Sequence, residues 1–287
     1  SSIPKLRHKQ TPNSLQFYNM SSNSIITSLI LIIICSCQEV DISILDKGPY
    51  SIVLIAGQSN TLSGKGLDPI LDAPMEGIMQ LGRLGKSDLR IIEAFEPLQH
   101  HGAGKDKIGF GLSFAKLLKA HLDGDSKILI IPCGSGGTGF SNHFWNKGDE
   151  LYMDAVERTK MVLERNAESK LECILWHQGE SDVGSPTYEA DLDNFIISLR
   201  DDLKAYNVPF ILGGMVPFWV EQDNNRIVQQ QIIANTVNRH NLVGYADPEI
   251  PFRIEKEDNS FNMVHYNAQG QRELGKRYFD EFLELTQ

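Results

Sequence analysis

Five continuous apolar runs constrain the fold of this chain more than any other feature. The runs lie at residues 51–56, 127–132, 172–177, 209–215 and 242–246, with a shorter one at 78–81. They are apolar at successive rather than alternate positions, as is typical of strands that are covered on both faces. Between them, apolar residues recur at helical spacing, as at Leu192, Phe195 and Leu199. This alternation predicts an α/β fold, a three-layer α/β/α sandwich with a five-stranded parallel sheet.

The length and charge of the chain limit its domain organisation and its partners. At 287 residues it is long enough for one large α/β domain, which we place at residues 38–287, after a leader at 1–37. The formal net charge is −10, and the leader holds basic residues but no acidic ones, so the domain is strongly acidic. A nucleic acid is therefore not expected as a partner.

The leader contains an uncharged apolar run, Ile25–Ile34. This run is shorter than the roughly 18 residues of a membrane-spanning helix and is typical of a signal-peptide core. The following Ile34-Cys35-Ser36-Cys37 resembles a bacterial lipobox, which predicts lipidation of Cys37 and membrane contact through that anchor only. We therefore expect an exported protein: a periplasmic or outer-membrane lipoprotein, or a secreted one. The alternative is a disordered tail with a chance apolar patch.

Polar segments follow three of the predicted strands. Gly57-Gln58-Ser59-Asn60 follows the first, the glycine-rich segment 133–139 the second, and the third ends in His177-Gln178-Gly179-Glu180. The carboxyl ends of parallel strands meet at one edge of a sheet, where α/β folds place their chemistry. A serine there needs a nearby base to become a nucleophile. Thr61 follows Asn60 where a G-x-S-x-G elbow has glycine, so another kind of serine hydrolase is indicated.

The histidines differ in their sequence surroundings. His265 lies in a loop just before the last amphipathic helix, whereas His177 ends an apolar run and is expected to be a buried structural residue. His100 and His101 fall in the long connection 61–107 and are expected to be solvated. The glycines of 134–139 match G-x-G-x-x-G, but no helical pattern follows them, and no metal-ligand spacing occurs. Neither a cofactor nor a metal is therefore expected.

These segments, in this order, resemble those of the SGNH hydrolases, and within them the sialate O-acetylesterase and acetylxylan esterase group, carbohydrate esterase family six. The most specific parts are Gly57-Gln58-Ser59-Asn60 and His177-Gln178-Gly179-Glu180, and the resemblance covers residues 50–285. It implies a flavodoxin-like sandwich and a serine carboxylic-ester hydrolase. The expected substrate is an acetylated carbohydrate, either acetylxylan or O-acetyl sialic acid.

The resemblance also implies roles for particular residues. Ser59 is expected to attack the acetyl carbonyl, and His265 to accept its proton and pass it to the departing sugar hydroxyl. The backbone N–H groups of Ser59 and of Gly136 or Gly137, with the side-chain amide of Gln178, are expected to bind the oxyanion.

The third member of the catalytic triad departs from the family pattern. The family usually carries an aspartate three residues before its histidine, and this chain has Asn262. An asparagine can accept a hydrogen bond from His265 but supplies no charge. We expect another carboxylate to replace the aspartate, with Glu180 as the first candidate and Asp258 and Asp247 after it. The alternative is a catalytically impaired carbohydrate-binding lipoprotein on the same fold.

Two further expectations concern loops and cysteines. Long loops usually build a binding rim, so residues 61–107 and 138–148 are expected to surround the substrate, with Phe140, His143, Phe144 and Trp145 as candidate contacts. Cys133 and Cys173 are expected to be buried and unpaired, because Cys133 follows one predicted strand and Cys173 begins the next, which places them near opposite ends of a parallel sheet.

Overall fold

A computed structural model describes residues 48–102, 104–122, 124–255 and 262–287. The predicted leader, its lipobox at Cys37 and the domain boundary lie outside the described residues, as does Asp258.

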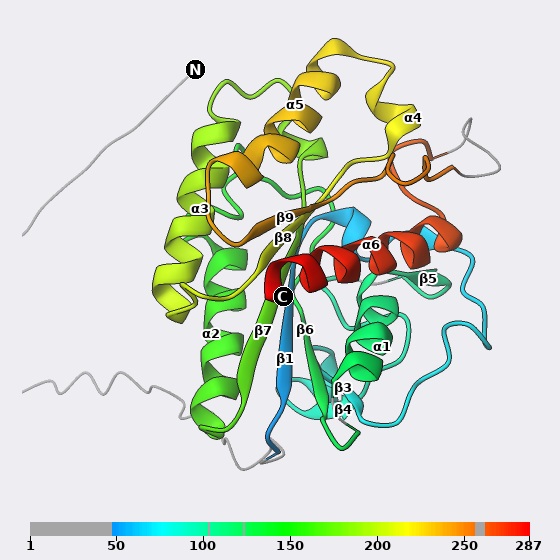
Figure 1. The fold of residues 1–287 in the computed structure, drawn as a ribbon, viewed down its shortest axis with the longest axis vertical. Coiled ribbons are helices and arrows are strands. Elements are labelled where there is room, and N and C mark those ends of the chain that lie inside the picture. The colour runs from blue at the N-terminus through cyan, green and yellow to red at the C-terminus, as the bar shows by residue number, and fades with distance from the viewer. Residues whose placement is uncertain (1–47, 103, 123, 256–261) are drawn as a thin grey trace, which may run out of the picture. The chain divides into compact units, whose positions relative to one another are not determined.

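A seven-stranded sheet forms the centre of the described chain (Figure 1). Its strand order is β4-β3-β6-β1-β7-β8-β9, and every neighbouring pair is parallel except β3 and β4. The strands are β1 (Ser51–Gly57), β3 (Ile78–Leu81), β4 (Ile91–Glu93), β6 (Ile128–Pro132), β7 (Lys170–His177), β8 (Phe210–Gly213) and β9 (Val243–Ala246). A separate two-stranded sheet pairs β2 (Gly64–Lys65) with β5 (Lys107–Ile108).

Helices cover both faces of the sheet, so the predicted three-layer α/β/α sandwich is confirmed (Figure 1). The α-helices are α1 (Gly111–His121), α2 (Glu150–Arg165), α3 (Tyr188–Leu203), α4 (Pro217–Val220), α5 (Asn224–Ala234) and α6 (Ala268–Thr286). No described helix has the length and apolarity needed to cross a membrane.

The central strand β1 shows why its sequence is apolar throughout. Ile52 and Leu54 point into the core beneath α2 and α3, whereas Val53 and Ile55 point into the core beneath α1 and α6. Each of these side chains is fully buried. Alternate residues of a strand face opposite sides, so a strand covered on both sides has no position left for a polar residue.

The expected count of five strands was too low, because the long connection 61–107 contributes to the sheet. It supplies β3, which had been noted as a short apolar run, and the antiparallel edge strand β4. Strand β4 has only three residues, all partly or well exposed, and therefore carries no continuous apolar signal. Two short parts of this connection, Ile78–Leu81 and Ile91–Glu93, thus extend the sheet.

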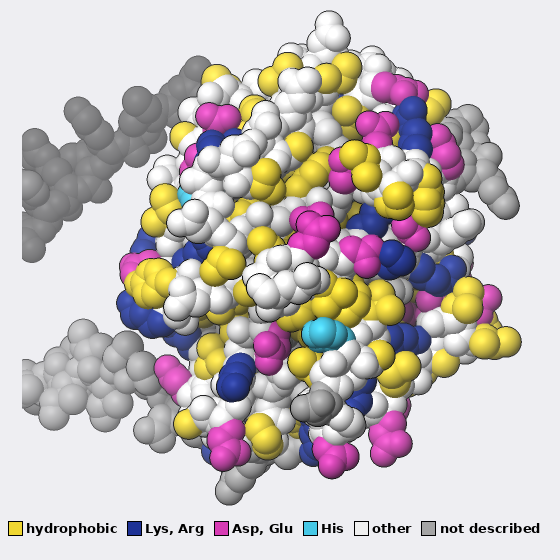
Figure 2. Space-filling view, viewed as in Figure 1, with side chains coloured by type: hydrophobic (Ala, Val, Ile, Leu, Met, Phe, Trp, Pro, Cys, Tyr) yellow, Lys and Arg dark blue, Asp and Glu magenta, His cyan; other side chains and the backbone are white. Residues whose placement is uncertain are grey.

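The molecular surface carries charges of both signs. On the face drawn in Figure 2, lysine and arginine side chains lie among acidic ones instead of gathering into one region. A polyanion that met basic groups on this face would therefore also meet acidic groups.

Candidate active site

Strand β1 ends in a tight turn that presents Ser59. Gly57 has a φ of +128°, and a Cβ there would overlap the carbonyl group of His177 on the neighbouring strand β7. Glycine therefore lets the two strands end against each other, and the N–H of Gln58 donates to the His177 carbonyl at 2.8 Å. The following 3-10 turn (Ser59–Thr61) buries Asn60 and Thr61 and leaves Ser59 partly exposed. The serine hydroxyl is thus held at the carboxyl edge of the sheet.

His265 lies beside this serine although 206 residues separate the two in the sequence. Its Nε2 is 2.8 Å from Ser59 Oγ, and its Nδ1 is 2.7 Å from Asn262 Oδ1. An amide oxygen can only accept, so this orientation of Asn262 places the imidazole proton on Nδ1. The lone pair of Nε2 then faces the serine hydroxyl, which is the arrangement that a general base requires.

Asn60 connects the serine turn to the loop that carries His265. Its Nδ2 donates to the Val264 carbonyl at 2.9 Å, and its Oδ1 accepts from the Tyr266 N–H at 3.1 Å. These two backbone groups belong to the residues on either side of His265. The side chain next to Ser59 therefore fixes the backbone of its partner histidine.

Glu180 occupies a different place from the one we expected. Its Oε1 accepts a hydrogen bond from Asn60 Nδ2 at 2.5 Å and lies 3.8 Å from His177 Nε2. The Nδ1 atom of His265, where a third triad member would bind, faces Asn262 instead. Glu180 thus contacts the residue that positions the histidine loop, and the place at Nδ1 of His265 for which we expected a carboxylate is taken by Asn262.

Burial alters the acid–base properties of Glu180 and His177. The Glu180 side chain is 3% exposed, and burial raises the pKa of its carboxyl group to about 7. Burial also lowers the pKa of His177 to about 3. His177 is therefore neutral at physiological pH and fully buried, as expected of a structural residue.

Glu180 should make stability depend on pH. Its pKa is higher in the folded chain than the ordinary 4.5, so the folded state binds more protons between pH 4.5 and 7. The stabilisation from this group is complete below pH 4.5 and is lost as pH rises through 7. Glu180→Gln removes this titrating group. The melting temperature of the variant minus that of the wild type should therefore be more positive at pH 8 than at pH 5. An equal difference at both pH values would contradict the raised pKa.

The loop after β6 brings backbone donors to the serine. A Cβ on Gly134 would overlap the Thr61 hydroxyl, so glycine is needed where this loop crosses the serine turn. A methyl group placed on Gly136 would lie 3.9 Å from Ser59 Cβ. Within the described ranges, neither the Ser59 nor the Gly136 N–H has a hydrogen-bond partner. Both groups are available to an oxyanion that forms between them. Gly136 and Gly137 are both exposed, and the 3.9 Å approach to Ser59 favours Gly136 as the donor.

Gln178 does not match its expected role as an oxyanion donor. Its side chain is buried, and its Nε2 donates to the Asp182 carboxylate at 2.7 Å. Asp182 is also buried and accepts from the backbone N–H groups of Phe140 and Ser141. A buried carboxylate needs such donors because it has lost its hydration. The amide nitrogen of Gln178 is therefore engaged with Asp182, which ties the segment after β7 to the loop after β6.

The aromatic residues expected at the substrate rim mostly lie in the core. Phe140 and Trp145 are buried and pack against Trp176 on β7. Phe144 is partly buried against the same core, and only His143 is well exposed. The loop 138–148 is thus anchored by its aromatic side chains, and Phe140 and Trp145 are too deeply buried to be the substrate contacts expected of them.

Sequence reasoning missed several residues that shape this site. Asn60 belongs to the Gly57-Gln58-Ser59-Asn60 motif, but its place in the sequence does not reveal its two hydrogen bonds to the backbone of the histidine loop. His100 was expected to be solvated and is instead 1% exposed, with its Nδ1 accepting from the Gly134 N–H.

The expected burial of Cys133 and Cys173 as free thiols is confirmed. Among the described residues, no cluster of histidine, cysteine or acidic side chains has the arrangement of a metal site.

Comparisons with known proteins agree with this geometry. Residues 49–284 match the model of the family described as carbohydrate esterase, sialic acid-specific acetylesterase. A probable carbohydrate esterase of Arabidopsis thaliana is 34% identical, over 57% of this chain and 68% of that protein. A probable 9-O-acetyl-N-acetylneuraminic acid deacetylase of Escherichia coli K12 is 26% identical, over 62% of this chain and 71% of its own length.

Solved structures share the fold. The crystal structure of NanS aligns with a TM-score of 0.71 at 21% identity, over 82% of this chain and 97% of NanS. An Arabidopsis thaliana protein structure aligns with a TM-score of 0.67 at 26% identity, over 82% and 99% of the two chains. The resemblance that the motifs indicated is confirmed. The chain belongs to the carbohydrate esterase family of sialic acid-specific acetylesterases, and it is a hydrolase of carboxylic esters.

Proposed function

We propose that this esterase removes acetyl groups from sugar hydroxyls through an acetyl-enzyme formed on Ser59. The observation that carries the proposal is the 2.8 Å contact between Ser59 Oγ and His265 Nε2. It unites a nucleophile at the end of β1 with a base in the loop before α6. The Asn262 oxygen on Nδ1 supports the tautomer that this base needs.

The chemistry follows from this geometry. As Ser59 Oγ bonds to the acetyl carbonyl carbon, its proton passes to His265 Nε2 and the carbonyl oxygen becomes an oxyanion. The N–H groups of Ser59 and Gly136 would donate to that oxygen; a single well-aligned donor is worth roughly a hundredfold or more in kcat. Collapse breaks the bond to the sugar oxygen, which takes the proton from Nε2. Water, deprotonated by His265, then releases acetate and restores the serine.

An O-acetylated sialic acid is the substrate class we propose for this site. The family match and the named activity of the Escherichia coli relative support it over acetylated xylan. The proposed substrate thus rests on these relatives.

Acetate release from a matched pair of substrates tests the proposal. We expect acetate from both 9-O-acetylated sialic acid and an acetylated xylo-oligosaccharide, with a higher kcat/KM for the sialic acid. A preference for the xylo-oligosaccharide would overturn the substrate assignment alone. Binding of either sugar without acetate release would instead support the catalytically impaired carbohydrate-binding alternative.

A further inference from the structure

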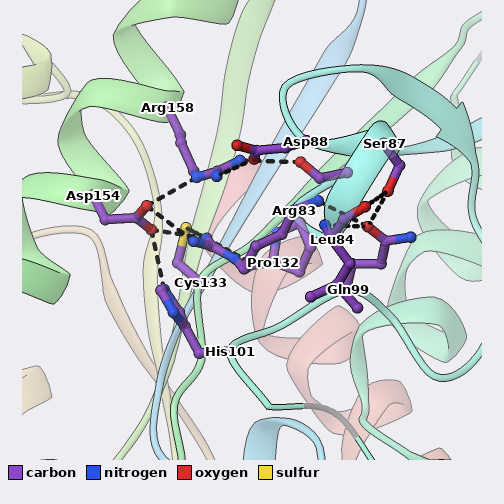
Figure 3. A network of polar contacts seen from close by, with 11 residues as sticks. Arg83, Leu84, Ser87, Asp88, Gln99, His101, Pro132, Cys133, Asp154 and Arg158 are labelled. Carbon is purple, nitrogen blue, oxygen red and sulfur yellow. Dashed lines mark hydrogen bonds and ion pairs between the residues drawn. The ribbon is translucent and has the colours of Figure 1, made fainter.

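A polar network surrounds the base of the loop that carries Gly136 (Figure 3). The Arg83 guanidinium donates to the Pro132 carbonyl at 3.0 Å and to both carboxylate oxygens of Asp154 on α2. Asp154 also faces the ring of His101, with 3.3 Å between Oδ2 and Nε2. The network therefore joins the segment after β3, the end of β6, helix α2 and the segment 99–101.

The residue before His100 is held as firmly as the one after it. Gln99 accepts, through its side-chain oxygen, from the backbone N–H groups of Arg83 and Leu84. Its own N–H donates to Gln80 Oε1 at 2.8 Å. Since His101 faces Asp154 on the other side, the backbone of His100 has little freedom to move.

His100 and His101 fix both polar backbone groups of Gly134. The Gly134 N–H donates to His100 Nδ1 at 2.9 Å, and the His101 N–H donates to the Gly134 carbonyl at 2.9 Å. The His100 ring must be neutral to accept at Nδ1, and burial keeps it so by lowering its pKa to about 3. The imidazole thus serves as a fixed acceptor for a backbone donor.

Gly134 lies two residues before Gly136, and a hydrogen bond also holds the backbone between them. The Ser135 N–H donates to the Gly57 carbonyl at 2.9 Å, at the end of the strand that presents Ser59. The position of the Gly136 N–H relative to the serine therefore depends on where Gly134 is held. A displacement of about 1 Å in such a site can cost roughly a hundredfold in rate.

We infer that His100 is a positioning residue, which sets the oxyanion donor of Gly136 by accepting a hydrogen bond from Gly134. This inference rests on the proposed function. His100 contacts no reacting atom, so its contribution is transmitted through two residues of backbone.

Three substitutions test this inference in the full chain. His100→Leu removes the acceptor, and His100→Gln places its oxygen one bond farther from the backbone. His100→Asn keeps an acceptor close to the position of Nδ1. We expect the Leu and Gln variants to lose about tenfold to a hundredfold in kcat with little change in KM, because the donor is misaligned in the transition state. The Asn variant should stay much closer to the wild type.

A second readout separates positioning from a loss of fold. Phosphonylation of the serine by a fluorophosphonate also develops charge on an oxygen, so its rate should fall in parallel with kcat. Melting temperatures identify any variant that does not fold. If the Leu variant does not fold, the Gln variant, which has a polar side chain, still tests the inference. Unchanged kcat in the Leu and Gln variants, or an equal loss in the Asn variant, would overturn the inference. An inactive wild type would instead refute the proposed function.

Discussion

Ser59→Ala is expected to lower kcat/KM for acetate release by about 10⁵-fold or more, since removal of a serine nucleophile costs this much in well-studied hydrolases. Without Oγ, no acetyl-enzyme can form, and His265 would have no proton to accept in the first step. The fold should not change, because the Ser59 side chain is partly exposed and belongs to no buried cluster. Steady-state kinetics and melting temperature together measure both expectations.

Ser135→Ala is the matched control for this variant. Ser135 lies on the neighbouring loop, near the same edge of the sheet, and is the next serine that could act as a nucleophile. The base Nε2 of His265 lies 2.8 Å from Ser59 Oγ, so Ser135→Ala should keep most of the activity. If Ser135→Ala were inactive while Ser59→Ala kept its activity, Ser135 would be the nucleophile instead of Ser59.

Asn262 is the site of the second large effect. Asn262→Gly removes the acceptor from Nδ1 of His265 and tolerates the left-handed backbone of this position, where φ is 53°. We expect kcat to fall by about a hundredfold or more, because the ring loses the partner that fixes its tautomer and orientation. The measurement is kcat with an activated aryl acetate and with the acetylated sugar.

The reverse substitution tests what the asparagine lacks. Asn262→Asp keeps the acceptor and adds the charge that stabilises an imidazolium, so kcat should rise by about tenfold, or about 1.4 kcal/mol of barrier. The gain is modest because the asparagine oxygen already selects the correct tautomer, unlike an asparagine that donates to the ring. A gain of several thousandfold would mean that the natural chain is catalytically impaired. No effect in either variant would show that Asn262 does not orient the histidine.

The fold was predictable because the strongest signals in the sequence come from burial on two faces. The apolar run at 51–56 identified β1 for this reason, and the helices were visible from their spacing of apolar residues. Strand β4 was missed because its three residues at the sheet edge are partly exposed. The serine turn and the histidine loop were found through motifs, since such residues show no periodicity of their own.

The contacts within the site could not be read from the order of segments along the rim. Glu180 and Gln178 were placed at the correct edge of the sheet, but the order of segments does not tell which way a side chain points. Gln178 faces the buried Asp182, and Glu180 faces Asn60, because buried carboxylates recruit the nearest donors. Phe140 was misassigned for a similar reason, since an aromatic residue in a polar loop has the same sequence appearance whether it covers the core or a substrate.

Mapping the residue that a fluorophosphonate modifies tests the central claim most directly. The intact wild-type chain would be labelled, digested and sequenced by mass spectrometry, with Ser59→Ala treated in parallel. The geometry predicts a single adduct on the peptide that contains Ser59, its formation blocked in Ser59→Ala and strongly slowed in His265→Ala, which lacks the base 2.8 Å from Oγ. An adduct on Ser135, or undiminished labelling of Ser59→Ala, would contradict the assignment of Ser59 and His265 as nucleophile and base.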